Sequence, residues 1–118
     1  MTPIDPAAPD TKQPSFDALN TLLVSSTAAA NDTDNTPAAR DAAWATRKVT
    51  SHQLEQLDLA VFTGNTAQLQ AAKDAMAPGM DQLKDLQQKI NALGNDFKEA
   101  AKVLTDIDKV VSTVKGLF

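Results

Sequence analysis

The amino-acid sequence predicts an all-α protein, a helical bundle or coiled-coil hairpin of about four helices. Ala, the residue that a helix tolerates best, is the dominant small residue, and β-branched residues are sparse before the final third. From Leu69 onward, apolar residues recur every seven positions, the repeat of helices packed on helices. We therefore expect one helical domain over residues 15–118, with helices at 15–30, 37–63, 66–77 and 79–116.

Residues 1–14 are predicted to form a disordered or extended tail. They contain Pro3, Pro6, Pro9 and Pro14, with few apolar groups between them. Prolines at this spacing cannot occupy a helix interior, because proline lacks the backbone N–H and its ring clashes with the preceding turn. We expect the tail to be an untethered terminus, with an export signal or a docking arm as the alternative.

The first helix is predicted to begin at Ser15, a favoured N-cap residue, and to fade before a loop at residues 31–36. Thr36-Pro37 then marks a second start, with Thr as the cap and Pro at the first helical position. In this second helix we expect Trp44 to pack across the mouth of the bundle rather than to serve as a ligand platform. The predicted apolar face of the first helix comprises Phe16, Leu19, Leu22 and Leu23.

The heptad is the strongest pattern in the chain and predicts the residues through which the protein packs and interacts. Its a and d positions are apolar over eight repeats, with Gly79 as the one weak position. In the last three repeats the g positions, Val103, Val110 and Leu117, are apolar as well, which predicts contact with at least two neighbouring helices. The predicted packing and interaction residues are Leu83, Leu86, Ile90, Leu93, Phe97, Leu104, Ile107, Val111 and Val114.

The dipeptide Pro78-Gly79 interrupts this repeat and decides the shape of the chain. Proline inside a helix costs about 3 kcal/mol and disfavours helical backbone at the preceding residue. On that ground we expect a turn or sharp bend here, while the unchanged heptad phase on both sides favours the alternative of one long kinked helix. Gly94 also lies in phase, and we expect it to be a glycine tolerated within the helix.

Composition and charge argue against several functions. The net charge is −4, and residues 1–65 hold four Lys and Arg against eight Asp and Glu, while residues 66–118 hold seven of each. Because nucleic acids and anionic membranes are bound mainly through cationic residues, neither is an expected partner. The chain has no Cys and a single His, His52, so no metal site, cofactor site, small-molecule substrate or catalytic residue is predicted.

One stretch of the sequence matches a known metal-binding motif in part. Asp32, Asp34 and Thr36 have the spacing that begins a calcium-binding loop. The sixth position, which should be Gly, is Pro37, and no Glu follows at the twelfth. We therefore interpret this stretch as a polar linker that ends in a helix cap.

The function predicted from these patterns is non-enzymatic. We expect a helical interaction or scaffold protein that self-associates, as a possible homo-oligomer, or that docks on the helices of a protein partner. The alternative is a small exported helical protein, such as an effector, a filament-like subunit or a pore-associated factor of a specialised secretion system. The N-terminus has no basic and apolar signal-peptide pattern, and no apolar run approaches the ~20 residues of a membrane span. We expect a soluble protein, cytoplasmic or exported by a route that reads no cleavable signal.

Overall fold

The computed structural model describes residues 13–63 and 66–117, and it describes the backbone alone for 60–63, 66, 68, 69, 116 and 117. These residues form helices and turns, with no strand among them. The predicted all-α class with four helices is confirmed. The elements are α1 (Gln13–Asn31), α2 (Pro37–Thr63), α3 (Thr66–Leu93), a 3-10 turn η1 (Gly94–Asp96) and α4 (Ala100–Leu117).

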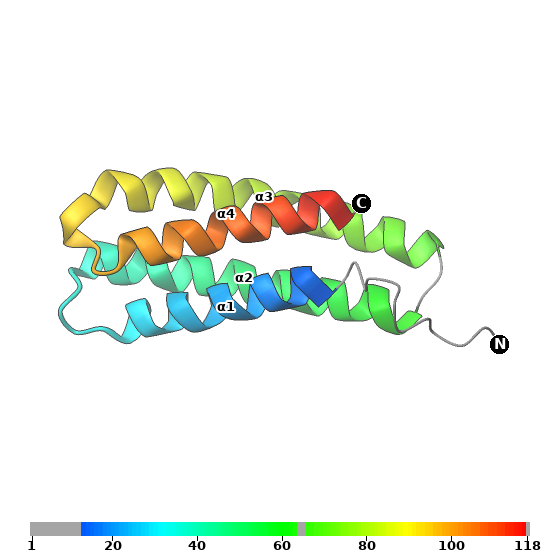
Figure 1. The fold of residues 1–118 in the computed structure, drawn as a ribbon, viewed down its shortest axis with the longest axis horizontal. Coiled ribbons are helices and arrows are strands. Elements are labelled where there is room, and N and C mark those ends of the chain that lie inside the picture. Colours follow the sequence, from blue (N-terminus) through cyan, green and yellow to red (C-terminus); the bar gives the residue numbers. More distant parts are fainter. Residues whose placement is uncertain (1–12, 64–65, 118) are drawn as a thin grey trace.

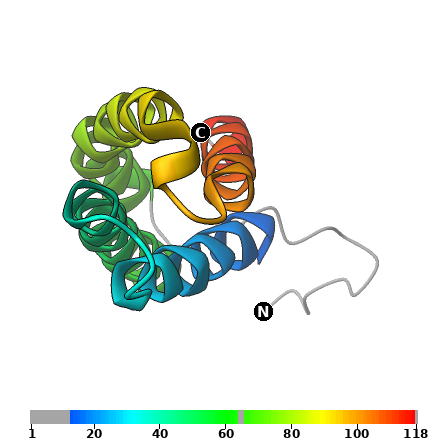
Figure 2. The same cartoon turned by 90° about the vertical axis from the view of Figure 1, so that its left-hand side faces the viewer.

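The four helices lie side by side and alternate in direction along the chain (Figure 1). Viewed end-on, they form a ring in which α1 contacts α2, α2 contacts α3, α3 contacts α4, and α4 closes on α1 (Figure 2). The α1–α2 loop and the α3–α4 connection lie at the same end of the bundle (Figure 1). The predicted contact of the last helix with two neighbours is therefore confirmed, since α4 packs on both α1 and α3.

The core lies along the axis of this ring and draws on every helix. Its largest buried side chains are supplied by all four helices and by the α3–α4 connection, and small Ala side chains fill the interface where α1 meets the first half of α2. Close approach of two helices requires small side chains at the crossing, which explains the Ala-rich sequence of this half. The largest fully buried apolar residues are Phe97, Leu19, Leu22, Leu57, Met76, Leu83, Ile90, Ile107, Val103 and Val110.

The first helix begins earlier than predicted. Gln13 and Pro14 belong to α1, where Pro14 occupies the first turn, a position at which the missing N–H removes no helical hydrogen bond. Ser15 is consequently not the N-cap but a buried residue of the first turn, and its Oγ has no hydrogen-bond partner among the residues that the structure describes. The rest of the predicted tail, residues 1–12, lies outside the described residues, as does the predicted Gly64-Asn65 helix boundary.

The start of α2 follows the sequence rule. Pro37 is the first helical residue, and the Ala39 N–H donates to Thr36 Oγ1 at 3.2 Å, so Thr36 caps the helix as predicted. In the preceding loop, Asp32 Oδ1 accepts the Asp34 N–H at 2.9 Å. That carboxylate therefore orders the turn, which agrees with the interpretation of this stretch as a linker.

The predicted turn at Pro78-Gly79 is wrong, because α3 continues through both residues. Pro78 is exposed, as is Asp74, whose carbonyl loses its helical partner when residue 78 is proline. Water can hydrate a carbonyl on the outer face, where helices ordinarily curve toward solvent. On the inner face, Gln53 of α2 donates from Nε2 to the Met76 carbonyl at 2.9 Å, two residues before the proline.

The break lies instead after Leu93, so the predicted helix 79–116 is two helices. Gly94, expected to be a tolerated helical glycine, has a φ of +54° and begins the 3-10 turn. Glu99, just before α4, also has a positive φ, +61°. Asn35, in the loop between α1 and α2, holds this connection in place. Its Oδ1 accepts the Lys98 N–H at 2.6 Å, and its Nδ2 donates to the Ala29 carbonyl at 3.0 Å. This side chain ties the two loops at one end of the bundle together.

Candidate functional site

The nine residues predicted to carry packing and interaction fall into two groups. The first group lies in the core, and the second is half-buried near the outer edges of the helix interfaces. A core side chain is covered by its own chain, so only the second group is accessible to another molecule in this fold. The core group is Leu83, Ile90, Phe97, Ile107 and Val114, and the half-buried group is Leu86, Leu93, Leu104 and Val111.

The break at Gly94 changes the heptad phase, which explains the half-buried Leu104 and Val111 of α4, whereas Leu86 and Leu93 precede the break and are half-buried at d positions of α3. In α3 the a positions Met76, Leu83 and Ile90 are fully buried. In α4 the g positions Val103 and Val110 are buried instead, together with the d positions. The a positions of α4 are therefore rotated out of the core centre. The apolar g positions were the sequence signal for this shift, although they were interpreted as a widening of the stripe.

This rotation leaves a groove on the outside of the α3–α4 pair. Its apolar part lies at the level of Pro78 and has a volume of about 400 Å³, within the range of small ligand pockets. Met76 and Val114 are buried at its base, Met80 and Val111 are half-buried, and Ala77 is exposed at its edge. We call this part the Pro78 end of the groove.

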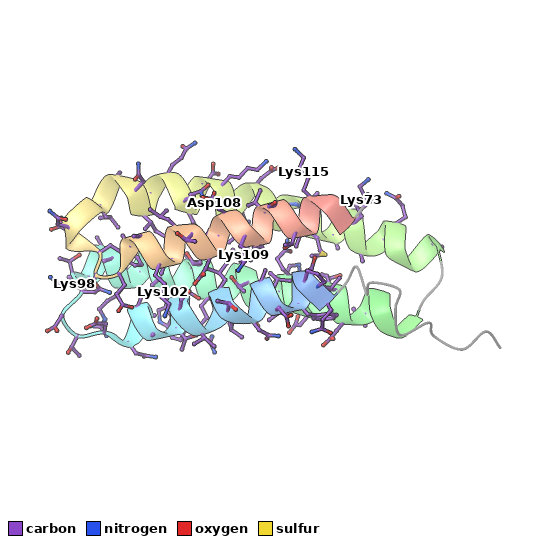
Figure 3. The ribbon with its side chains drawn as sticks, in the orientation of Figure 1. Lys73, Lys98, Lys102, Asp108, Lys109 and Lys115 are labelled. Carbon is purple, nitrogen blue, oxygen red and sulfur yellow. The ribbon has the colours of Figure 1, made fainter. Side chains whose placement is uncertain are left out.

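Charged residues surround the Pro78 end. Lys73 and Lys84 of α3, Lys115 of α4 and a single carboxylate, Asp81, line it. All four are exposed, and within the part of the chain that the structure describes none of the three ammonium groups is paired with a carboxylate. Figure 3 shows Lys73 and Lys115 projecting outward from α3 and α4 in the same half of the bundle. The Pro78 end is thus an apolar floor with an excess of positive charge at its rim.

Toward the Gly94 connection the α3–α4 pair has a second hollow, which is polar and shares no lining residue with the first. Gln87, Gln88 and Asn91 of α3 face Leu104 and Asp108 of α4 there, and Gln87 Nε2 donates a hydrogen bond to Asp108 Oδ1. We call this part the Asp108 end. The two walls of the groove are formed by α3 and α4. On each helix the lining residues lie three or four positions apart, which places them on one face of that helix. These are 73, 77, 80, 84, 87 and 91 on α3, and 104, 108, 111 and 115 on α4.

Trp44 and His52 lie away from this groove. Trp44 is 48% exposed, and the Arg47 guanidinium stacks over its ring, 4.9 Å from the ring centroid. Arg47 also donates from Nε to Thr27 Oγ1 of α1 at 3.1 Å, so the stacked cation bridges two helices. The Trp44 ring is thus half exposed beside Arg47 and also lines a shallow hollow with Ala30 of α1, and its packing across the mouth of the bundle stays a prediction. His52 is exposed on α2, beside the outer α2–α3 surface.

Residues 13–63 and 66–117 contain neither a cluster of metal-ligating side chains nor a helix suited to a membrane. No three His, Asp or Glu side chains in them lie close enough together to hold a metal ion. No helix in them combines the length and the apolar character that crossing a membrane requires. Comparison of the chain with models of protein families, with curated proteins and with solved structures found no match.

Proposed function

We propose that this chain is a non-enzymatic helical interaction protein that binds a helix, from a partner protein or from a second copy, in the outer α3–α4 groove. One observation carries the proposal: two adjacent helices present heptad-spaced walls around a half-buried apolar floor, and no other helix among residues 13–63 and 66–117 covers it. Helices dock into such grooves through apolar residues spaced three and four apart.

The character of the groove side chains supports binding rather than catalysis. The Pro78 end is formed by aliphatic and thioether groups with ammonium groups around them. These groups bury apolar surface and pair with charges, which are the two contributions that most helix interfaces use. The five fully covered heptad residues named above support the bundle, and the groove residues are the ones available for docking.

A direct test measures mass and helix binding in solution. We expect light scattering after size-exclusion chromatography to show either self-association across the micromolar range or a monomer that binds amphipathic helical peptides. Val111→Glu replaces an apolar side chain of the groove floor by a charged one and should weaken either association at least tenfold, because it removes apolar surface that docking would bury.

Val24→Glu is the matched control, since Val24 is 68% exposed on α1 and lies outside the groove. It should leave association unchanged. A chain that stays monomeric and binds no amphipathic helix at millimolar concentration would contradict the proposed function.

We keep export as the second proposal, which rests on the Pro- and Asp-containing residues 1–14 and the absence of Cys. Under this proposal the protein accumulates in the culture supernatant of the cells that produce it. Deletion of residues 1–14 should abolish that accumulation without lowering the amount inside the cell. Protein confined to the cell with its N-terminus intact would contradict it.

A further inference from the structure

We infer that the occupant of the α3–α4 groove is an acidic amphipathic helix of a partner protein, with its carboxylates placed at the Pro78 end. This inference rests on the proposed function and specifies its partner. The whole chain carries a net charge of −4, yet three lysines and one aspartate surround the apolar floor of the groove. An apolar face flanked by Asp or Glu matches this combination of floor and rim.

The charge distribution disfavours a second copy bound groove to groove. Burial of apolar surface drives helix docking, so the two Pro78 ends would have to face each other. In that arrangement Lys73, Lys84 and Lys115 of one copy would lie opposite the same three residues of the other. Like charges placed across an interface cost binding free energy and act against that partner. An acidic partner meets no such repulsion.

The length of the groove favours a helix over a small amphiphilic molecule. The α3 wall extends from Lys73 to Asn91, a separation of 18 positions that corresponds to about 27 Å at ~1.5 Å per residue. A fatty acid would fill only the Pro78 end and would leave Gln87, Asn91 and Asp108 unused. A helix of about 18 residues covers both ends, and polar side chains in its second half can bond to these groups.

The two ends also give the docked helix a direction. Carboxylates belong beside the three lysines, and amide or cationic side chains belong beside Asp108. Met76 and Met80 line the apolar floor, and the unbranched, flexible Met side chain can repack around different apolar residues. The groove therefore selects its partner mainly through charge and tolerates variation in the apolar residues.

The experiment uses two designed 18-residue peptides with the same Leu-based apolar face. One carries Glu on both flanks of the first half and the other carries Lys there. The chain has no Cys, so Ala77→Cys gives a single attachment point for an environment-sensitive dye at the edge of the groove. Ala92→Cys, exposed on α3 and outside the groove, is the control position.

We expect the Glu peptide to change the fluorescence at position 77 and not at position 92, and to bind at least tenfold more tightly than the Lys peptide. The triple variant Lys73→Glu, Lys84→Glu, Lys115→Glu should reverse this preference. The matched triple variant Lys89→Glu, Lys98→Glu, Lys109→Glu changes the net charge equally, outside the groove, and should retain the preference.

The outcomes separate the inference from the proposed function. Equal binding of both peptides at position 77 would overturn the acidic partner and leave helix docking intact. Binding of laurate at position 77 without binding of either peptide would overturn the helix in favour of a small anionic amphiphile. Absence of any binding by the folded, labelled chain would overturn the inference and the proposed function together.

Discussion

Pro78-Gly79 and the connection from Gly94 to Glu99 depart in opposite directions from the backbone that their local sequence predicts. At Pro78-Gly79 the local sequence favours a break, and the helix continues. At Gly94 the local sequence allows a helix, and the chain breaks. The difference lies in what each segment contacts in the folded protein, because contacts with distant residues can override the local preference of the backbone.

At Pro78-Gly79 the decisive partner is Gln53. A Cβ at residue 79 would lie 2.5 Å from Gln53 Oε1, so the absence of a side chain at Gly79 is what makes room for this fully buried amide. Gly79 is thus not simply a weak heptad position, because its lack of a side chain leaves the space that the Gln53 side chain of α2 occupies. At Gly94 a Cβ would meet nothing within 4 Å, and the requirement there is the positive φ.

Asn35→Ala should have the largest effect on stability, because it removes the contact that holds the Gly94 connection. Both hydrogen bonds of the buried amide are lost, and the Lys98 N–H loses its acceptor. We expect a loss of about 3 kcal/mol in the free energy of unfolding, measured by urea titration. Asp34→Ala in the same loop, an exposed neighbour, should cost less than about 1 kcal/mol. Equal losses in the two variants would show that Asn35 does not fasten the connection.

Gly79→Ala tests whether the Gln53 side chain needs the space beside residue 79. The new Cβ displaces the amide and overpacks the interface between α2 and α3, at a cost of about 2 kcal/mol after the gain in helix propensity. In a Gln53→Ala background the same change should become neutral or stabilising, because the obstructing side chain is gone. A double-mutant cycle from chemical denaturation measures this coupling. A coupling energy near zero would contradict the proposed packing.

Pro78→Ala should stabilise the protein by about 1–2 kcal/mol. The change restores the N–H that can bond to the Asp74 carbonyl in α3, and greater freedom of the unfolded chain offsets part of the gain. Circular dichroism should show higher helicity and a higher melting temperature. If neither rises, the proline has a favourable role in the shape of α3 that the continuous helix does not explain.

Gly94→Ala should have the smallest effect, a loss of about 1 kcal/mol, because Ala tolerates a φ of +54° poorly. Space is not the cause, since the added Cβ meets no atom. Gly94→Asn, which accepts this backbone conformation more readily, should lose less. Thermal unfolding of the two variants gives the comparison, and a larger loss for Asn than for Ala would exclude the backbone explanation.

The candidate groove could be predicted in part. The heptad identified Val111 and Leu104 among the interaction residues, and both line the groove. It also named Leu83, Ile90 and Phe97, which the bundle covers. The lysines of the Pro78 end were missed because they occupy polar heptad positions on two different helices. Only the packing of α3 against α4 brings them to one site.

The sequence by itself determined the helical class, the apolar face of α1 and the capped start of α2 at Thr36-Pro37. These features follow from local rules of propensity, periodicity and capping, which act within a few residues. Tertiary structure decided that α3 continues through Pro78 and ends at Leu93, because side chains far along the chain meet these segments, Gln53 the continuous helix and Asn35 the break. The rotation of the last helix had a sequence signal in the apolar g positions Val103 and Val110, but only the packing of α4 on α1 and α3 distinguishes that rotation from a wider apolar stripe.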